Sequence, residues 1–161
     1  MKKLSIVVAT YNRAPYLLRT LESLARQTLS PGLFEILVVN NNSSDNTPEV
    51  VAGFAGSHPQ LQVRMVTETS QGISYARNCG IASSVGQYIV FIDDDEEANP
   101  GFAKSYFCFF ENNPGLDAAG GAVVPVYEAP LPAWYSYYIE KMITGAFDLG
   151  DRMVPFRGKR Y

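Results

Sequence analysis

Cysteine and histidine, which build many catalytic and metal sites, are nearly absent from this sequence. Its 161 residues include two cysteines and one histidine. Cys79 and Cys108 lack metal-ligand spacing, so the sequence does not indicate a zinc site of the usual kind. We interpret both residues as buried free thiols in a reducing compartment.

Long apolar runs and an excess of positive charge are also missing. The first apolar run, residues 4–9, is too short for a signal peptide, and no stretch approaches the roughly 20 apolar residues that span a bilayer. The formal net charge of -3 argues against a nucleic-acid-binding protein. We therefore expect a cytoplasmic chain, with contact at the inner face of the membrane left open. A polyanionic ligand would therefore need a local source of positive charge, such as a bound metal ion.

Glycine-rich nucleotide motifs are missing as well. No G-x-G-x-x-G pattern follows a predicted strand, which argues against a dinucleotide-binding oxidoreductase. The segment after the first predicted strand, VATYNRAP, contains no glycine. Enzymes that make nucleotide sugars by nucleotidyl transfer generally need a glycine- and arginine-rich loop there, so this class is the weaker alternative.

The apolar residues that are present predict alternating strands and helices. Short apolar runs predict strands at residues 4–9, 34–39, 61–67, 87–92 and 122–126. Apolar spacing and turn residues predict helices at 14–28 with Asn12 as N-cap, from Thr47 onward, at 72–84, and from Pro100 to about Asn113. The predicted fold class is α/β, a mostly parallel central sheet flanked by helices, with a fifth strand of mixed direction.

Polar residues follow each of the first four predicted strands. They lie at residues 10–13, 40–45, 68–72 and 93–97. Sheets of this kind bind ligands beyond the carboxyl ends of their strands. Four separate segments are therefore expected to form one site.

The strongest candidate within that site is the acidic run from Asp93 to Glu97, directly after the apolar strand YIVFI. Adjacent carboxylates repel one another, and a divalent cation that also binds substrate phosphates would relieve the repulsion. If the strand continues, Asp93 and Asp95 face one ligand while Asp94 points away. The alternative is a solvated acidic loop before the next helix, which could account for Glu96 and Glu97.

Four segments in this order resemble the inverting glycosyltransferases with a GT-A fold, of the glycosyltransferase family 2 type: IVVATYNR, VVNNNSSDNT, QGISYARNCGI and YIVFIDDDE. The resemblance covers about residues 4–126. It implies a nucleotide-diphosphate sugar donor, a divalent metal (Mg or Mn), a carbohydrate or lipid-linked acceptor, and a role in cell envelope polysaccharide biosynthesis. It also implies that residues 1–126 form the nucleotide-sugar-binding domain and that 127–161 begin the acceptor-side region.

The resemblance also assigns roles to individual residues. It implies that Thr10 and Tyr11 line the base and ribose, that Asp93 holds the ribose, and that Asp95 coordinates the metal. Asn40 stands where the family usually has a base-reading aspartate, so the identity of the base is open. The remaining residues assigned to nucleotide-sugar binding are Gln71, Arg77 and Asp94.

Two of these assignments have a structural alternative. Arg77 could bind the base or phosphates, or form a salt bridge with an acid at the strand ends. Asp45 could contact the ligand, or cap a helix or form an Asx turn.

The general base that inversion requires is not identified. In the family it lies in the second half of the catalytic domain, and we expect this sequence to be a fragment that binds donor better than it transfers sugar. A donor-binding module without catalysis is the alternative. Residues 127–161 contain four acids whose sequence context does not single out a general base: Glu128, Glu140, Asp148 and Asp151. They also contain aromatic residues that either stack on a sugar or pack in the protein core: Trp134, Tyr135, Tyr137 and Tyr138.

Overall fold

The computed structural model describes residues 3–136 and residue 139. The chain divides into two units, Met1–Gly115 and Leu116–Tyr161. The first unit holds a sheet of four strands: β1 (Leu4–Thr10), β2 (Phe34–Asn40), β3 (Val63–Thr67) and β4 (Tyr88–Asp93). Its helices are α1 (Ala14–Ala25), α2 (Thr47–Ser57), α3 (Ile73–Ser83) and α4 (Phe102–Asn112). The predicted α/β fold class is confirmed.

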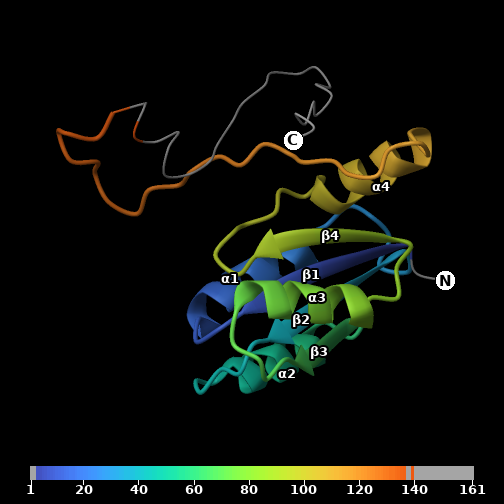
Figure 1. Ribbon diagram of the computed structural model, residues 1–161, viewed down its shortest axis with the longest axis horizontal. Helices are drawn as coiled ribbons and strands as arrows, with labels where there is room; N and C mark the ends of the chain where they lie inside the picture. Colours follow the sequence, from blue (N-terminus) through green and yellow to red (C-terminus); the bar gives the residue numbers. More distant parts are fainter. Residues whose placement is uncertain (1–2, 137–138, 140–161) are drawn as a thin grey trace, which may run out of the picture. The chain divides into compact units, whose positions relative to one another are not determined.

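All neighbouring strands are parallel, in the order β3-β2-β1-β4. The chain moves outward from β1 through β2 to β3 and then returns to the other side of β1 to form β4. Because crossovers between parallel strands have one hand, this reversal places the connecting helices on opposite faces of the sheet. Figure 1 shows α3 in front of the sheet and α1 behind it. The carboxyl ends of β1 and β4 therefore lie side by side at the point where the winding reverses, which is where sheets of this kind bind ligands.

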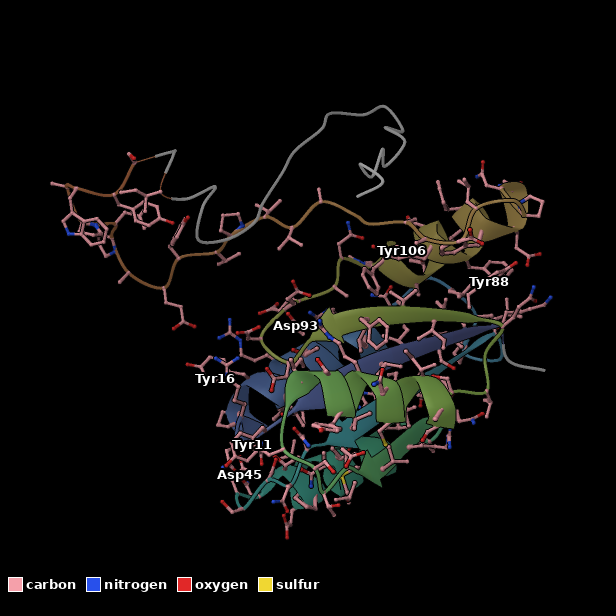
Figure 2. All side chains as sticks on the ribbon, viewed as in Figure 1. Tyr11, Tyr16, Asp45, Tyr88, Asp93 and Tyr106 are labelled. Atoms are coloured by element: carbon pink, nitrogen blue, oxygen red, sulfur yellow. The ribbon has the colours of Figure 1, made fainter. Side chains whose placement is uncertain are left out.

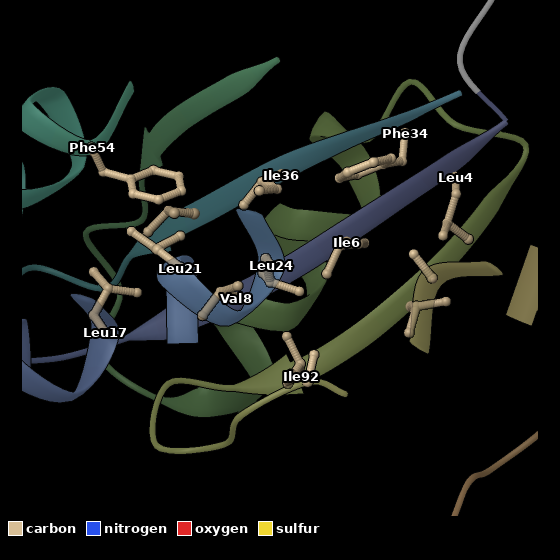
Figure 3. Packing of buried hydrophobic residues seen from close by; sticks show 14 of the residues in the cluster. Leu4, Ile6, Val8, Leu17, Leu21, Leu24, Phe34, Ile36, Phe54 and Ile92 are labelled. Carbon is tan, nitrogen blue, oxygen red and sulfur yellow. The ribbon is translucent and has the colours of Figure 1, made fainter. Parts of the chain in front are cut away.

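The larger part of the core lies between the sheet and α1. Leu17, Leu21 and Leu24 of α1 are fully buried and face Ile6 and Val8 of β1 (Figure 3). Burial of each such side chain contributes about 1.5–3 kcal/mol. A smaller cluster on the α3 face consists of Val7, Leu37, Val39 and Ala76. Apolar residues on both faces explain why β1 and β2 are nearly continuous apolar runs.

In the second unit, the predicted strand at residues 122–126 is wrong. These residues form no strand, and Val124 and Val126 are 78% and 85% exposed. Apolar residues favour a strand only when a neighbouring strand bonds their backbone groups, and the sequence pattern contains no information about that neighbour. Trp134 is 68% exposed, while the hydroxyl oxygens of Tyr127 and Tyr135 lie 2.9 Å apart. Tyr137, Tyr138, Glu140, Asp148 and Asp151 lie outside the described residues.

Across the described ranges 3–136 and 139, no helix is long and apolar enough to cross a membrane. Cys79 and Cys108 are free, as predicted, but they are half-buried and not buried.

A buried ion pair that the sequence pattern did not indicate lies at the amino end of the sheet. Glu35 is fully buried in β2. Its Oε1 accepts hydrogen bonds from Ser5 Oγ at 2.6 Å and Val85 N at 3.0 Å, and its Oε2 accepts one from Arg64 Nε at 2.9 Å. Burial raises the pKa of Glu35, but the hydrogen bonds from Arg64 and Ser5 outweigh it and hold the pKa below its ordinary value.

Glu35→Gln is expected to lower the free energy of unfolding at pH 7 by roughly 2–4 kcal/mol, because it leaves Arg64 without its anionic partner. The folded pKa is lower than the unfolded one, so this stabilisation is present above about pH 4.3 and is lost as the pH falls through the folded pKa. Urea unfolding from pH 7 to pH 3 should show the wild type and variant converging at low pH. Glu49→Gln, on the exposed side of α2, is the control. If the difference in unfolding free energy between the wild type and Glu35→Gln does not change with pH, the charged pair of Glu35 and Arg64 is contradicted.

Gly86 is required where the chain enters β4. A Cβ atom at this position would lie 2.5 Å from Ser5 N and 2.6 Å from the carbonyl carbon of Leu4, both backbone atoms. Gly86→Ala is expected to destabilise the fold by about 1–3 kcal/mol in chemical denaturation. Gly53→Ala, in an open position on α2, should instead stabilise it by about 0.5–1 kcal/mol. Equal changes in the free energy of unfolding for Gly86→Ala and Gly53→Ala would contradict the close contact between residue 86 and the backbone of β1.

Candidate functional site

The loops at the carboxyl edge of the sheet enclose one cavity of about 370 Å³. Figure 2 shows Tyr11, Tyr16 and Asp93 at this same end of the sheet. The predicted convergence of separate loops is therefore observed. The lining residues are Ala9, Thr10, Tyr11, Arg13, Asn41, Gln71, Gly72, Ile73, Ala76, Arg77, Asp93, Asp94 and Asp95.

All of the predicted site residues except Asn40 line this cavity. Asn40 is buried at the end of β2, and its Oδ1 accepts a hydrogen bond from Ser43 N at 2.9 Å. Its side chain therefore shapes the loop that follows β2. The next residue, Asn41, lines the cavity in its place.

Asn41 connects the loops after β2 and β3. Its Nδ2 donates to Glu68 O at 3.0 Å and Ser70 O at 2.7 Å, and its Oδ1 accepts from Gly72 N at 2.8 Å. Gly72 has a φ of 139°, a conformation that side-chain-bearing residues rarely adopt. The amide of Asn41 thus fixes the backbone that forms the cavity wall before α3. Sequence reasoning missed this role, because a run of three asparagines does not reveal which one lines the cavity.

The acidic run does not continue β4 as a strand. β4 ends at Asp93, and Asp94 and Asp95 form a turn. The predicted alternation, with Asp94 pointing away, is therefore wrong, since it holds only for an extended chain. Asp94 is buried, yet its carboxylate meets the same side chain as that of Asp95: both accept from Arg13 Nη1, at 3.2 Å and 2.7 Å.

Two arginines pair with the three aspartates. Arg77 Nη2 donates to Asp93 Oδ1 at 3.0 Å, and its guanidinium carbon lies 5.9 Å from the centre of the Phe91 ring. This is the salt bridge to a strand-end acid that the sequence left as one alternative for Arg77. Hydrogen bonds to Asp95 and then Asp94 raise the pKa of Arg13. Sequence reasoning missed Arg13, although the motif TYNR after β1 already placed a cation at this edge.

Repulsion among the acids is visible at Glu96. Glu96 is half-buried, and its Oε2 accepts a hydrogen bond from Asp93 N at 3.1 Å. Burial and then the charges of Asp93 and Asp95 raise its pKa, against a lowering by the bond to Asp93 N. The raised pKa of Glu96 therefore reflects its burial first and the neighbouring carboxylates second.

Asp45 is a helix cap, which was the structural alternative for it. Its Oδ2 accepts from Ala14 N at 3.0 Å, at the start of α1, and its Oδ1 accepts from Thr47 N and Oγ1 at the start of α2. The hydrogen bond from Thr47 is the main reason why its pKa is lowered. The prediction of Asn12 as the N-cap of α1 is wrong. Asn12 has a φ of 53°, and its Oδ1 instead accepts from Ser44 N at 2.7 Å.

Thr10 has an unsatisfied hydroxyl. It lies at the end of β1, is 3% exposed, and within the described residues its Oγ1 is buried without a hydrogen-bond partner. A buried hydroxyl without a partner costs about 1–3 kcal/mol. Such an atom in a residue that lines the cavity is a second feature, besides the acids, that fits a ligand-binding role.

The acids fit a divalent cation that also binds a phosphorylated ligand. Within the described part of the chain, no three His, Cys, Asp or Glu side chains are grouped so that they could hold a metal ion by themselves. Mg²⁺ and similar hard cations commonly bind through one or two carboxylates, with waters and substrate phosphates completing the shell. The carboxylates of Asp93 and Asp95 are about half exposed and of the right chemistry.

The family model for glycosyl transferase family 2 matches residues 5–156. This chain belongs to that family. The fold described above is thus a GT-A fold. A relative in Escherichia coli, the glycosyltransferase YibD, is 36% identical over 98 residues, which are 61% of this chain and 27% of YibD.

Two solved glycosyltransferase structures show the same fold. The mannosyltransferase PcManGT from Pyrobaculum calidifontis, in complex with GDP-Man and Mn²⁺, is 32% identical with a TM-score of 0.56 over 58% of this chain and 27% of that one. S. aureus TarS in complex with UDP is 26% identical with a TM-score of 0.64, over 77% of this chain and 38% of that one. The chain therefore spans roughly a quarter to two fifths of these relatives.

Asp45→Ala is expected to destabilise this family member by about 1–3 kcal/mol, because the caps of α1 and α2 are both lost. Asp45→Asn keeps an acceptor oxygen and should cost less. Thermal and urea unfolding measure the difference. If Asp45→Ala leaves stability unchanged but abolishes ligand binding, the capping assignment is contradicted.

Proposed function

We propose that the cavity at the carboxyl ends of β1 and β4 binds a nucleotide-diphosphate sugar, and that the chain is the donor-binding part of an inverting, metal-assisted glycosyltransferase. The supporting observation is that one cavity, at the reversal point of the sheet, is lined both by three consecutive aspartates and by Thr10, whose hydroxyl is unsatisfied. Membership of the family supports sugar transfer. The complexes of PcManGT with GDP-Man and of TarS with UDP support the donor class.

The proposed roles follow the positions around the cavity. Thr10, at the end of β1, and the half-exposed Tyr11 that follows it contact the base and ribose. Gln71 and the half-buried Gly72 approach the nucleotide from the loop before α3. Asp93 holds the ribose, and Arg77, which bonds Asp93 at 3.0 Å, orients that carboxylate and contributes positive charge.

Asp95 is the proposed metal ligand, with Mg²⁺ or Mn²⁺ as the ion. When bound, the ion supplies Lewis-acid stabilisation of the charge that develops on the departing nucleoside diphosphate. Asp94 is buried beside Asp95, and its backbone oxygen accepts a hydrogen bond from Thr20 Oγ1 at 2.9 Å. This bond ties the turn to α1 and holds the carboxylate of Asp95 at the cavity.

The transfer step is attack by an acceptor hydroxyl on the anomeric carbon of the donor sugar. The bond from that carbon to the diphosphate oxygen breaks, and a general base takes the hydroxyl proton. The acceptor, a carbohydrate or lipid-linked sugar, would meet the region that starts near residue 127; this division of the sequence stays a prediction. We assign the general base to no described residue.

Binding of UDP, GDP, dTDP and CDP with and without Mn²⁺ tests the proposal. One diphosphate should stabilise the protein in thermal-shift assays only with the metal, by about 2.7 kcal/mol at 100 times its dissociation constant. Asp95→Asn should weaken the metal-dependent binding at least tenfold. Glu97→Gln removes a nearby charge that pairs with Arg19 outside the cavity, and should leave binding unchanged. Full metal-dependent binding by Asp95→Asn would falsify the metal assignment.

A further inference from the structure

We infer that Arg13 is a cation that competes with the metal: its guanidinium holds Asp94 and Asp95 in the donor-free protein, and a divalent ion binds only as Arg13 leaves Asp95. The inference rests on the proposed function, since it concerns the same ion. It assigns Arg13 as a positioning residue that couples metal binding to diphosphate binding.

The first argument is the shared nitrogen. Arg13 Nη1 lies 3.2 Å from Asp94 Oδ1 and 2.7 Å from Asp95 Oδ2. A nitrogen of one positive group therefore bridges two consecutive carboxylates. A divalent ion bound to either carboxylate would lie close to this positive charge, so repulsion between the two cations would favour binding of the ion when Arg13 moves away.

The second argument is the difference in burial between the two acids. The side chain of Asp94 is 8% exposed, while those of Asp95 and Arg13 are 45% and 48% exposed. The half-exposed pair of Arg13 with Asp95 is weak, as surface ion pairs usually are. Arg13 is the only side chain in the described part of the chain that bonds the Asp94 carboxylate. Leaving the buried Asp94 carboxylate without a cation costs free energy, so the departure of Arg13 requires a replacement cation.

The third argument is that the side chain of Arg13 can move while its backbone stays in place. The carbonyl oxygen of Arg13 accepts from Tyr16 N and Leu17 N in the first turn of α1, at 3.0 Å each. Its guanidinium carbon already lies 5.5 Å from the centre of the Tyr16 ring. Arg13 lines the cavity, so a displaced guanidinium remains near the proposed diphosphate, whose oxygens match its planar fork.

This exchange makes the metal and the diphosphate cooperative. The ion releases Arg13, and the diphosphate then binds both the ion and the released guanidinium. Each ligand therefore raises the affinity for the other by the same factor. Without Arg13, the ion should bind more tightly alone and gain less from the diphosphate.

Mn²⁺ binding measured by electron paramagnetic resonance, without nucleotide, tests the competition. Arg13→Gln should bind Mn²⁺ about tenfold more tightly than the wild type, the effect of removing one unit charge a few ångströms from the ion. Arg13→Lys keeps a competing charge and should resemble the wild type. Arg19→Gln removes the same charge from α1, where its partner is Glu97, and should also resemble the wild type.

A second measurement works without a charge-removing variant. The Arg13 Nε–Hε signal in nuclear magnetic resonance, assigned with Arg13→Lys, should shift as Mg²⁺ is titrated into the wild type, while the Arg19 signal should not. Equal Mn²⁺ affinity of the wild type and Arg13→Gln, or an Arg13 signal that ignores Mg²⁺ while the ion binds, would overturn the role of Arg13 and leave the donor site intact. A normal Arg13 response without binding of any nucleoside diphosphate would overturn the donor site alone. Absence of metal binding in every variant, both without and with each nucleoside diphosphate, would overturn both.

Discussion

The site depends on the reversal of winding at β1. Because β2 and β3 lie on one side of β1 and β4 on the other, the carboxyl ends of β1 and β4 are neighbours, and α1, which follows β1, lies on the opposite face from α3, which leads into β4. The backbone after each strand therefore opens toward the same space. Tyr11, Gly72 and Asp93 meet there, although 82 positions in the sequence separate the first from the third. A different strand order from the same elements would scatter these side chains.

The reversal concentrates acids at one edge, and the fold responds with charge balance. Arg77 bonds Asp93, Arg13 bonds Asp94 and Asp95, and Asp45 is used by two helix termini. Glu96, within the acidic run, has a pKa raised mainly by burial. At the opposite end of the sheet, Glu35 and Arg64 form a separate buried pair that stabilises the fold away from the site. Charge is thus compensated locally, in a chain whose net charge is only -3.

Sequence reasoning predicted the four strands of the sheet and the site at its carboxyl edge. It failed where contacts between distant residues determine the local structure. The periodicity and apolar runs gave β1 to β4 and all four helices, because these patterns reflect burial by helices on both faces. The pattern at residues 122–126 was equally apolar but forms no strand. Asn12 was a sound N-cap by residue type, yet Asp45, 31 residues away from Ala14, provides the cap. The partners of Arg13 and the buried position of Asn41 were equally beyond local patterns.

The central claim is that Asp95 and the ends of β1 and β4 hold a cation and a diphosphate together. A crystal structure with Mn²⁺ and the nucleoside diphosphate that binds, with anomalous data collected at the manganese edge, tests it most directly. The account predicts an anomalous peak at the Asp95 carboxylate, diphosphate density bridging to it across the ends of β1 and β4, and Arg13 no longer bonded to Asp95. A manganese peak at other acids, or nucleotide density away from this edge, would contradict it.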